Sequence, residues 1–180
     1  MTMRRGVVFM MALVGVLSAV PGRAAAETGR AELRGTEEGS AIAGTAVLTE
    51  TPDGLQVSIQ VTGAPAGKHA VHIHQYGKCD EAGNAAGGHF NPDKVAHGFL
   101  PSDGPAKAHP GDMGNLEVGP DGRGALSLLL PGVSLSGGKY AVAGRAVVLH
   151  DKADDFGQPT GNAGGRIGCG VILVIKALGD

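Results

Sequence analysis

The segment GLQVSIQVTG (residues 54–63) decides the fold class, because its apolar and polar residues alternate strictly. The apolar positions are Leu55, Val57, Ile59 and Val61. Successive side chains of a β-strand point to opposite faces, so this alternation gives one apolar face and one polar face. The pattern predicts a half-buried strand of an antiparallel sheet.

Similar patterns recur along the chain. The TPDG sequence before this segment predicts a turn, and AIAGTAVLTE before it predicts another strand, so residues 41–62 predict a hairpin. Further strands are predicted at 68–75, at 169–175 and within 139–150, and a second hairpin at 114–130. The sequence shows no convincing amphipathic helix. Seven or eight short strands joined by turns predict an all-β sandwich or flattened barrel.

Two long segments interrupt the strands. Residues 77–112 are dense in glycine, proline, aspartate and histidine and show no helical or strand period. A second, glycine-rich segment covers residues 151–168. A loop as long as the first, inside a compact domain, indicates either function or disorder.

The N-terminal segment has the three parts of a secretory signal peptide. Two arginines precede an apolar run at 6–20, and an A-x-A-like site follows at 24–26. We therefore expect residues 1–26 to be a signal peptide and residues 27–180 to form a single secreted or periplasmic domain without a membrane span. The alternative is an uncleaved N-terminal anchor, for which the apolar run is short.

Charge and cysteine content narrow the class of protein. Removal of the leader changes the formal net charge from −2 to −5, and an acidic chain without a basic cluster argues against a nucleic-acid partner. The chain has two cysteines, Cys79 and Cys169. In an exported protein these predict one disulfide, and the alternative is a pair of reduced thiols.

The stretch HAVHIHQYG (residues 69–77) places His72 and His74 on one face of a predicted strand. Two neutral imidazoles so close together suit a common cation, whereas the alternative is two surface histidines. His150 ends another predicted strand and would complete a copper-type imidazole site. Asp112, three residues after His109, would complete a set of histidines and one aspartate that suits zinc.

Five segments occur in order over residues 41–175: HAVHIHQYG, GGHFNP, HPGDMGN, LHDKADDFG and GNAGGRIGCGV. Together they resemble the motif series of copper–zinc superoxide dismutases. The first cysteine lies five residues after His74 and ten before His89, which is similar to the bacterial exported, periplasmic type. The resemblance implies a Greek-key antiparallel barrel or sandwich of about eight strands, immunoglobulin-like, with long metal-binding and active-site loops.

The resemblance also implies roles for individual residues. The implied copper ligands are His72, His74, His89 and His150. The implied zinc ligands are His89, His97, His109 and Asp112. Asp154 would accept hydrogen bonds from one ligand of each metal, Arg166 would lie beside the open copper face, and the Cys79–Cys169 disulfide would pin the long loop to the barrel. His69 would be structural and link loop backbones.

The implied activity is that of an oxidoreductase. Copper would cycle between two oxidation states and disproportionate superoxide anion to dioxygen and hydrogen peroxide, protecting against exogenous or periplasmic superoxide. Zinc would organise the site, and His89 and Arg166 would take part in catalysis. The loop at 155–161 is shorter than in eukaryotic members and lacks their lysine, so Lys152 or Lys107 would have to attract the anion.

Two alternatives differ from this reading. A copper-only dismutase would have lost zinc ligands, and a copper-holding module on the same fold would have lost a copper ligand or the arginine. All these residue types are present in the chain, which favours the copper–zinc enzyme. The sequence leaves open whether the domain is a monomer or a homodimer.

Overall fold

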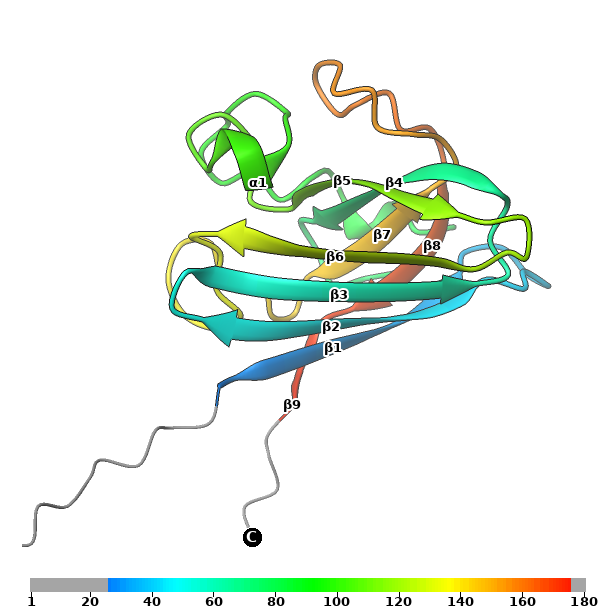
Figure 1. The fold of residues 1–180 in the computed structure, drawn as a ribbon, viewed down its shortest axis with the longest axis horizontal. Coiled ribbons are helices and arrows are strands. Elements are labelled where there is room, and N and C mark those ends of the chain that lie inside the picture. Colours follow the sequence, from blue (N-terminus) through cyan, green and yellow to red (C-terminus); the bar gives the residue numbers. More distant parts are fainter. Residues whose placement is uncertain (1–25, 176–180) are drawn as a thin grey trace, which may run out of the picture.

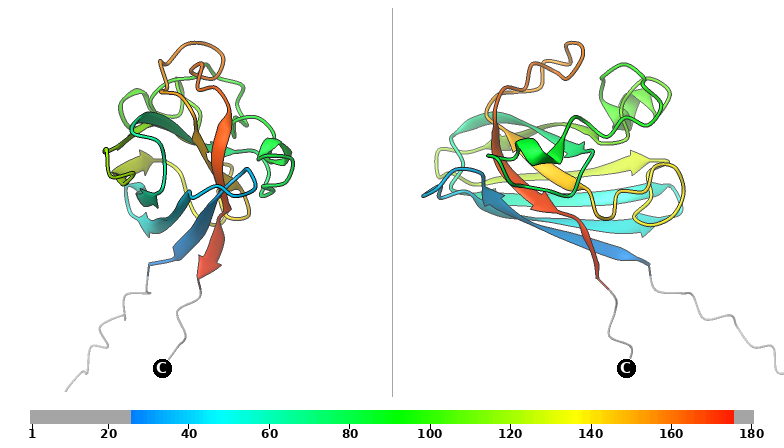
Figure 2. Two further views of the ribbon diagram at one scale, coloured as in Figure 1. Left: turned by 90° about the vertical axis from the view of Figure 1, so that its right-hand side faces the viewer. Right: turned by 180° about the vertical axis from the view of Figure 1, so that it is seen from behind.

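The computed structural model describes residues 26–175, which form an antiparallel β-barrel with long loops on one side (Figures 1 and 2). The strands are β1 (Thr28–Gly35), β2 (Ala43–Thr51), β3 (Gly54–Thr62), β4 (Gly67–His74), β5 (Asp112–Val118), β6 (Gly124–Pro131), β7 (Ala146–His150), β8 (Arg166–Val171) and β9 (Leu173–Ile175). Between β4 and β5 lie a 3-10 turn, η1 (Asn84–Ala86), and a one-turn α-helix, α1 (Leu100–Asp103). Apart from Ala26, the expected signal peptide lies outside the described residues.

The barrel closes through eight strands. They pair in the circular order β1, β2, β3, β6, β5, β4, β7, β8 and back to β1, while β9 pairs only with β1. Because β3 lies beside β6 and β4 lies beside β7, two connections cross over the ends of the barrel, as in a Greek key. The predicted all-β Greek-key barrel of about eight strands is confirmed.

The alternation along β3 sets the core, as predicted. Leu55, Val57, Ile59 and Val61 are at most 2% exposed, whereas the polar residues of the second half of the strand are exposed. Large side chains that are fully buried on other strands include Leu33, Leu48, Leu116, Leu130 and Leu149. Burying each leucine stabilises the fold by roughly 1.5–3 kcal/mol before entropy is counted, so the barrel interior is a rigid support for its loops.

The structure differs from the sequence-based expectation in the bounds of two strands. The strand expected within 139–150 begins only at Ala146. Before it, the chain turns at Gly144, whose φ is +76°, and the backbone N–H groups of Val142 and Ala143 donate to Ser134 and Leu135. The segment 169–175 is divided at Ile172, which pairs instead with the loop at Gly144 and Arg145.

The described residues contain little helix. η1 has three residues and α1 has four, which agrees with the lack of an amphipathic pattern in the sequence. Within residues 26–175, no helix has the length and apolar character needed to cross a bilayer.

The two long loops meet on one side of the barrel. The loop with α1 and the loop between β7 and β8 rise on the side away from both ends of the described chain (Figures 1 and 2). Their roots are neighbours because β4 and β7 pair directly, with Val71 opposite Leu149 and His72 opposite Val148. Residues far apart in the sequence are therefore gathered over the end of β4.

Candidate metal centre

His72 and His74 both leave β4 on the side of the loops. Their residues are 0% and 1% exposed, and Val71 and Ile73 between them pack into the hydrophobic core. The pairing of β4 with β5 shifts between Ala70 and His72, which places His72 opposite Asp112. The predicted arrangement of two imidazoles on one strand face is confirmed.

The long loop returns to β4 and brings His89 beside this pair. An isolated β-bridge joins His74 to His89, and Phe90 N–H donates to the carbonyl of Ile73 at 2.9 Å. Potential ligand atoms of four residues lie within 4.8 Å of one another: His72, His74, His89 and His150. We call these four residues the copper-type set.

In two histidines of the copper-type set, Nδ1 lies near a backbone carbonyl oxygen. His74 Nδ1 lies 2.9 Å from the Gly87 carbonyl oxygen, and His150 Nδ1 lies 3.5 Å from that of Gly164. The two Nε2 atoms face each other at 3.2 Å. Tetrahedral ligands about 2.0–2.1 Å from a metal are about 3.3 Å apart, so this spacing suits two ligands of one ion.

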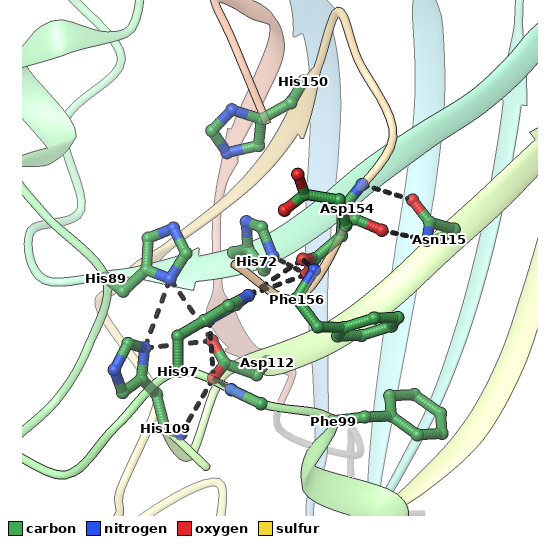
Figure 3. Close-up of polar contacts among 12 residues, drawn as sticks. His72, His89, His97, Phe99, His109, Asp112, Asn115, His150, Asp154 and Phe156 are labelled. Carbon is green, nitrogen blue, oxygen red and sulfur yellow. Dashed lines mark hydrogen bonds and ion pairs between the residues drawn. The ribbon is translucent and has the colours of Figure 1, made fainter. Parts of the chain in front are cut away.

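A second cluster surrounds Asp112 (Figure 3). Oδ1 of Asp112 lies 3.2 Å from His89 Nδ1 and 3.1 Å from His109 Nδ1, and the two Nδ1 atoms are 3.3 Å apart. Oδ2 accepts backbone N–H bonds from Gly98 and His109 and lies 2.9 Å from His97 Nδ1. These spacings also suit one tetrahedral ion. We call His89, His97, His109 and Asp112 the zinc-type set.

His89 lies at the junction of the two sets. A second group of potential ligand atoms within 4.8 Å comprises His72, His89, His97 and Asp112. His72 appears in it because its ring lies between the two sets, with ring centroids 4.1 Å from His89 and 5.3 Å from His97. The Nδ1 atom of His89 faces the zinc-type set, which leaves its Nε2 for the copper-type set.

Asp154 joins one residue of each set (Figure 3). Its Oδ2 lies 2.8 Å from His72 Nε2, and its Oδ1 lies 2.9 Å from His97 Nε2. The other nitrogen of each ring, Nδ1, is buried and has no hydrogen-bond partner within residues 26–175. The contact of His97 Nδ1 with Asp112 has ion-pair distance but not hydrogen-bond geometry.

These two orphaned nitrogens test whether the site fits metal ions. A buried polar atom without a partner costs about 1–3 kcal/mol, so native structures rarely leave one. One metal ion in each set would satisfy His72 Nδ1 and His97 Nδ1, respectively. The all-imidazole set suits copper, whereas the set with a carboxylate suits zinc. The residues present therefore fit the two expected ions.

Burial keeps three histidines of the copper-type set, His74, His89 and His150, neutral in the metal-free protein. Desolvation, together with the charge repulsion of neighbouring histidines, lowers the pKa of His74 to about 2, of His150 to about 3 and of His89 to about 4. Neutral imidazoles offer lone pairs to a cation without first losing a proton.

The carboxylates of the site are held in their charged form. Burial raises the pKa of Asp112 and of Asp154, but hydrogen bonds from the surrounding histidines outweigh it and hold both pKa values well below the usual range. For His97, burial lowers the pKa, but the contacts with Asp112 and Asp154 raise it to about 9. A metal ion at Nδ1 of His97 would therefore have to displace a proton.

Arg166 lies at the edge of a cavity beside the copper-type set. Its guanidinium donates to the carbonyls of Gly83 and Gly87 at 2.6 Å each, which fixes its position. The cavity, of about 440 Å³, is lined by Gly88, His89, His150, Lys152, Thr160, Asn162, Ala163, Gly164 and Arg166. Lys152 is thus placed at this cavity, whereas Lys107 is not among its lining residues.

The two cysteines form the expected disulfide. Cys79 and Cys169 are bonded with Cα atoms 5.7 Å apart, across a sequence separation of 90. The bond ties the start of the long loop to β8, three residues after Arg166. The same loop segment carries the Gly83 and Gly87 carbonyls that hold the guanidinium, so the disulfide supports the position of Arg166.

His69 has the structural place expected for it. Its Nδ1 lies 2.8 Å from the backbone oxygen of His150, and its Nε2 lies 2.8 Å from that of Pro65. It belongs to neither set of potential ligands. His69 therefore links the end of β7 to the loop before β4.

Two residues of the site were missed by the sequence analysis. Asn115 lies within the HPGDMGN segment but received no role, and it binds the backbone of Asp154 through two hydrogen bonds. Gln158 lies in the short loop and binds the backbone of His97. Both pair a side chain with a distant backbone, and no local spacing in the sequence signals such a contact.

The fold and the site define a class of protein: an antiparallel Greek-key barrel with two adjacent clusters of potential metal ligands that share a histidine. Comparison with known proteins identifies the family. The family model for Copper/zinc superoxide dismutase (SODC) matches residues 42–172. The chain belongs to this family; it is a superoxide dismutase, an oxidoreductase with copper and zinc as cofactors.

Individual relatives agree with this assignment. The "Extracellular superoxide dismutase [Cu-Zn]" of Caenorhabditis elegans is 39% identical over 140 residues, which cover 74% of this chain and 62% of that protein. The "Superoxide dismutase [Cu-Zn]" of Deinococcus radiodurans is 37% identical over 145 residues, covering 75% and 79%. The crystal structure of the clock protein EA4 is similar with a TM-score of 0.73 and 36% identity, covering 87% of this chain and 100% of that one.

Proposed function

We propose that this chain binds copper through His72, His74, His89 and His150 and zinc through His89, His97, His109 and Asp112, and that superoxide reacts at the copper. The observation that carries the proposal is the position of His89 between the two sets, with Nδ1 directed at Asp112 and His109. One imidazole can serve two ions only if each of its nitrogens faces a different set, and the contacts of His89 Nδ1 with Asp112 and His109 support this role.

The two ions have different tasks. Copper, when bound, supplies the one-electron exchange by which two superoxide anions and two protons become dioxygen and hydrogen peroxide, while zinc has no redox chemistry. Nε2 of His89 can hold a proton for the peroxide product.

The chain must also attract an anion despite its acidic charge. Arg166 and Lys152 line the cavity next to His89 and His150 and provide a local positive field there. Such a field raises the association rate of a small anion and makes it sensitive to salt. We infer that Lys152 takes the place of the lysine that the short loop lacks.

Superoxide decay tests the proposal. The chain from residue 27 onward, loaded with both metals, should hold one copper and one zinc and should decompose superoxide near the diffusional ceiling of about 10⁸–10⁹ M⁻¹s⁻¹. His150→Ala should lose copper and most of this rate, whereas Gln56→Ala, remote from the site, should lose neither. Full activity of His150→Ala would contradict the copper assignment, and metal binding without catalysis would indicate a copper-holding module.

We also infer that the protein works outside the cytoplasm, in the periplasm or the secreted fraction, after removal of residues 1–26. The disulfide and the extracellular nematode relative support this inference. Mass spectrometry of the exported chain should find Glu27 at its N-terminus. The absence of a nucleic-acid partner stays a prediction. Sedimentation analysis of the mature chain distinguishes a monomer from a homodimer.

A further inference from the structure

The loop between β7 and β8 is attached to the backbone of a proposed zinc ligand. The N–H of His97 donates to Oε1 of Gln158 at 2.9 Å, and Nε2 of Gln158 donates to the carbonyl of His97 at 2.8 Å. The carboxamide thus pairs with both polar groups of one residue, as a neighbouring strand would, across 61 positions of sequence.

His97 has no strand to support it. It lies in an irregular part of the long loop between η1 and α1 and is only 4% exposed. Among the described residues, Gln158 is the hydrogen-bond partner found for its backbone N–H and carbonyl. Buried backbone groups without partners are costly, so the position of the His97 main chain depends on this side chain.

The loop around Gln158 is compact and lies directly on His97. Gly161 N–H donates to Gly157 at 2.6 Å, and Asp155 N–H donates to Gly161 at 3.0 Å. A Cβ on Gly161, whose φ is +73°, would lie 2.0 Å from Asp154 Oδ1 and 2.7 Å from His97 Nε2. Only glycine therefore allows the loop to close over the contact between His97 and Asp154.

One loop consequently fixes His97 at two points. Asp154 holds Nε2 of the imidazole, and Gln158 holds the main chain. With the ring tip and the backbone both fixed, the direction of Nδ1 is fixed as well. Nδ1 is the orphaned atom that faces the zinc-type set.

We propose that Gln158 is a positioning residue that aims Nδ1 of His97 at zinc. The inference rests on the proposed zinc site and adds to it a residue that does not itself bind the ion. It also joins the zinc-type set to the cavity, because Thr160, Asn162 and Gly164 of the same loop line the cavity wall.

Zinc affinity tests the proposal on the metal-free, disulfide-bonded mature chain. Competition with a chromophoric chelator gives the dissociation constant for Zn²⁺, and the visible absorption of Co²⁺ in the same site reports its geometry. Gln158→Ala should weaken zinc binding about 10- to 100-fold, the usual effect of losing a group that orients a ligand, and should change the Co²⁺ spectrum. Gln158→Glu keeps an acceptor for the His97 N–H but loses the donor, so its affinity should be intermediate.

The matched control is Gln56→Ala, which removes a carboxamide that donates to Ser127 on the barrel wall and should leave both readouts unchanged. If Gln158→Ala lowered only the melting temperature and kept the wild-type zinc affinity and Co²⁺ spectrum, Gln158 would be merely structural and the proposal overturned. His97→Ala separates this failure from that of the proposed zinc site: if it too left zinc affinity unchanged, the zinc assignment itself would be wrong.

Discussion

Asn115 and Asp154 are joined by two hydrogen bonds that hold the centre of the site to the barrel. Asp154 N–H donates to Oδ1 of Asn115 at 2.7 Å, and Nδ2 of Asn115 donates to the Asp154 carbonyl at 3.0 Å (Figure 3). Asn115 belongs to β5 and Asp154 to the loop after β7. Because the carboxylate of Asp154 contacts both His72 and His97, this single attachment supports both metal-type sets.

Replacement of Asn115 by alanine should therefore weaken the binding of both copper and zinc. Loss of the two hydrogen bonds should cost about 1–3 kcal/mol of unfolding free energy in the metal-free protein, and the displaced carboxylate should lower copper and zinc affinity about 10-fold or more. Urea unfolding and metal titration measure the two effects. Asn84→Ala removes an amide that donates only to Glu81 in the described residues, and it should change neither metal affinity.

The metal-free protein should be most stable near pH 6.5. The pKa values of His74, His89 and His150 are lowered to between about 2 and 4, so below the unfolded-state pKa of about 6.5 the unfolded chain binds more protons and stability falls with acid. The raised pKa of His97, about 9, has the opposite sign. The stabilisation of the folded state by protonated His97 is complete below pH 6.5 and is lost as the pH rises to about 9.

Urea midpoints of the metal-free chain between pH 4.5 and 9 measure this curve. The plot of urea midpoint against pH should be steeper on its acidic side. There, up to three histidines take up protons on unfolding, whereas on the alkaline side unfolding releases only the proton of His97. His97→Asn should flatten the alkaline side alone. A midpoint that stayed constant from pH 6.5 to 4.5 would show that His74, His89 and His150 are not buried in neutral form.

Much of the site could be predicted from the sequence because its ligands lie in short motifs. The spacing of His72 and His74 needs only the two-residue period of a strand, and the alternation in β3 fixed its inward face in the same way. β1 was missed because two of its three inward residues are small, Gly29 and Ala31. A Cβ on Gly29 would lie 2.5 Å from Leu135, so its identity is set by a contact more than one hundred residues away.

The supporting residues could not be predicted for a related reason. Asn115 and Gln158 act on backbone groups of residues 39 and 61 positions away, and polar residues in glycine-rich loops have no period that reveals their partners. The same limit applied to Lys152 and Lys107, since the sequence offered both as positive groups for the cavity. Only the folded loops place Lys152 at its wall.

Reversal of the charge at Lys152 should slow the capture of superoxide. Lys152→Glu replaces a positive by a negative charge at the cavity wall, so the second-order rate at low salt should fall by about 10-fold and should depend less on ionic strength. Lys107→Glu makes the same change of net charge at an exposed position that does not line the cavity. Pulse radiolysis at several ionic strengths compares the two, and equal losses would show that net charge alone governs the rate.

Removal of the disulfide should affect both stability and the position of Arg166. The Cys79–Cys169 bond spans 90 positions, and replacement of both cysteines by serine should lower the unfolding free energy of the metal-free chain by about 2–4 kcal/mol. The freed loop carries the carbonyls of Gly83 and Gly87 that hold the guanidinium, so the dismutation rate of the fully metal-loaded variant should fall as well. Urea unfolding and superoxide decay measure the two losses separately. A variant with lower stability but an unchanged rate would show that the disulfide stabilises the fold without positioning Arg166, and an unchanged stability would contradict its role in the barrel.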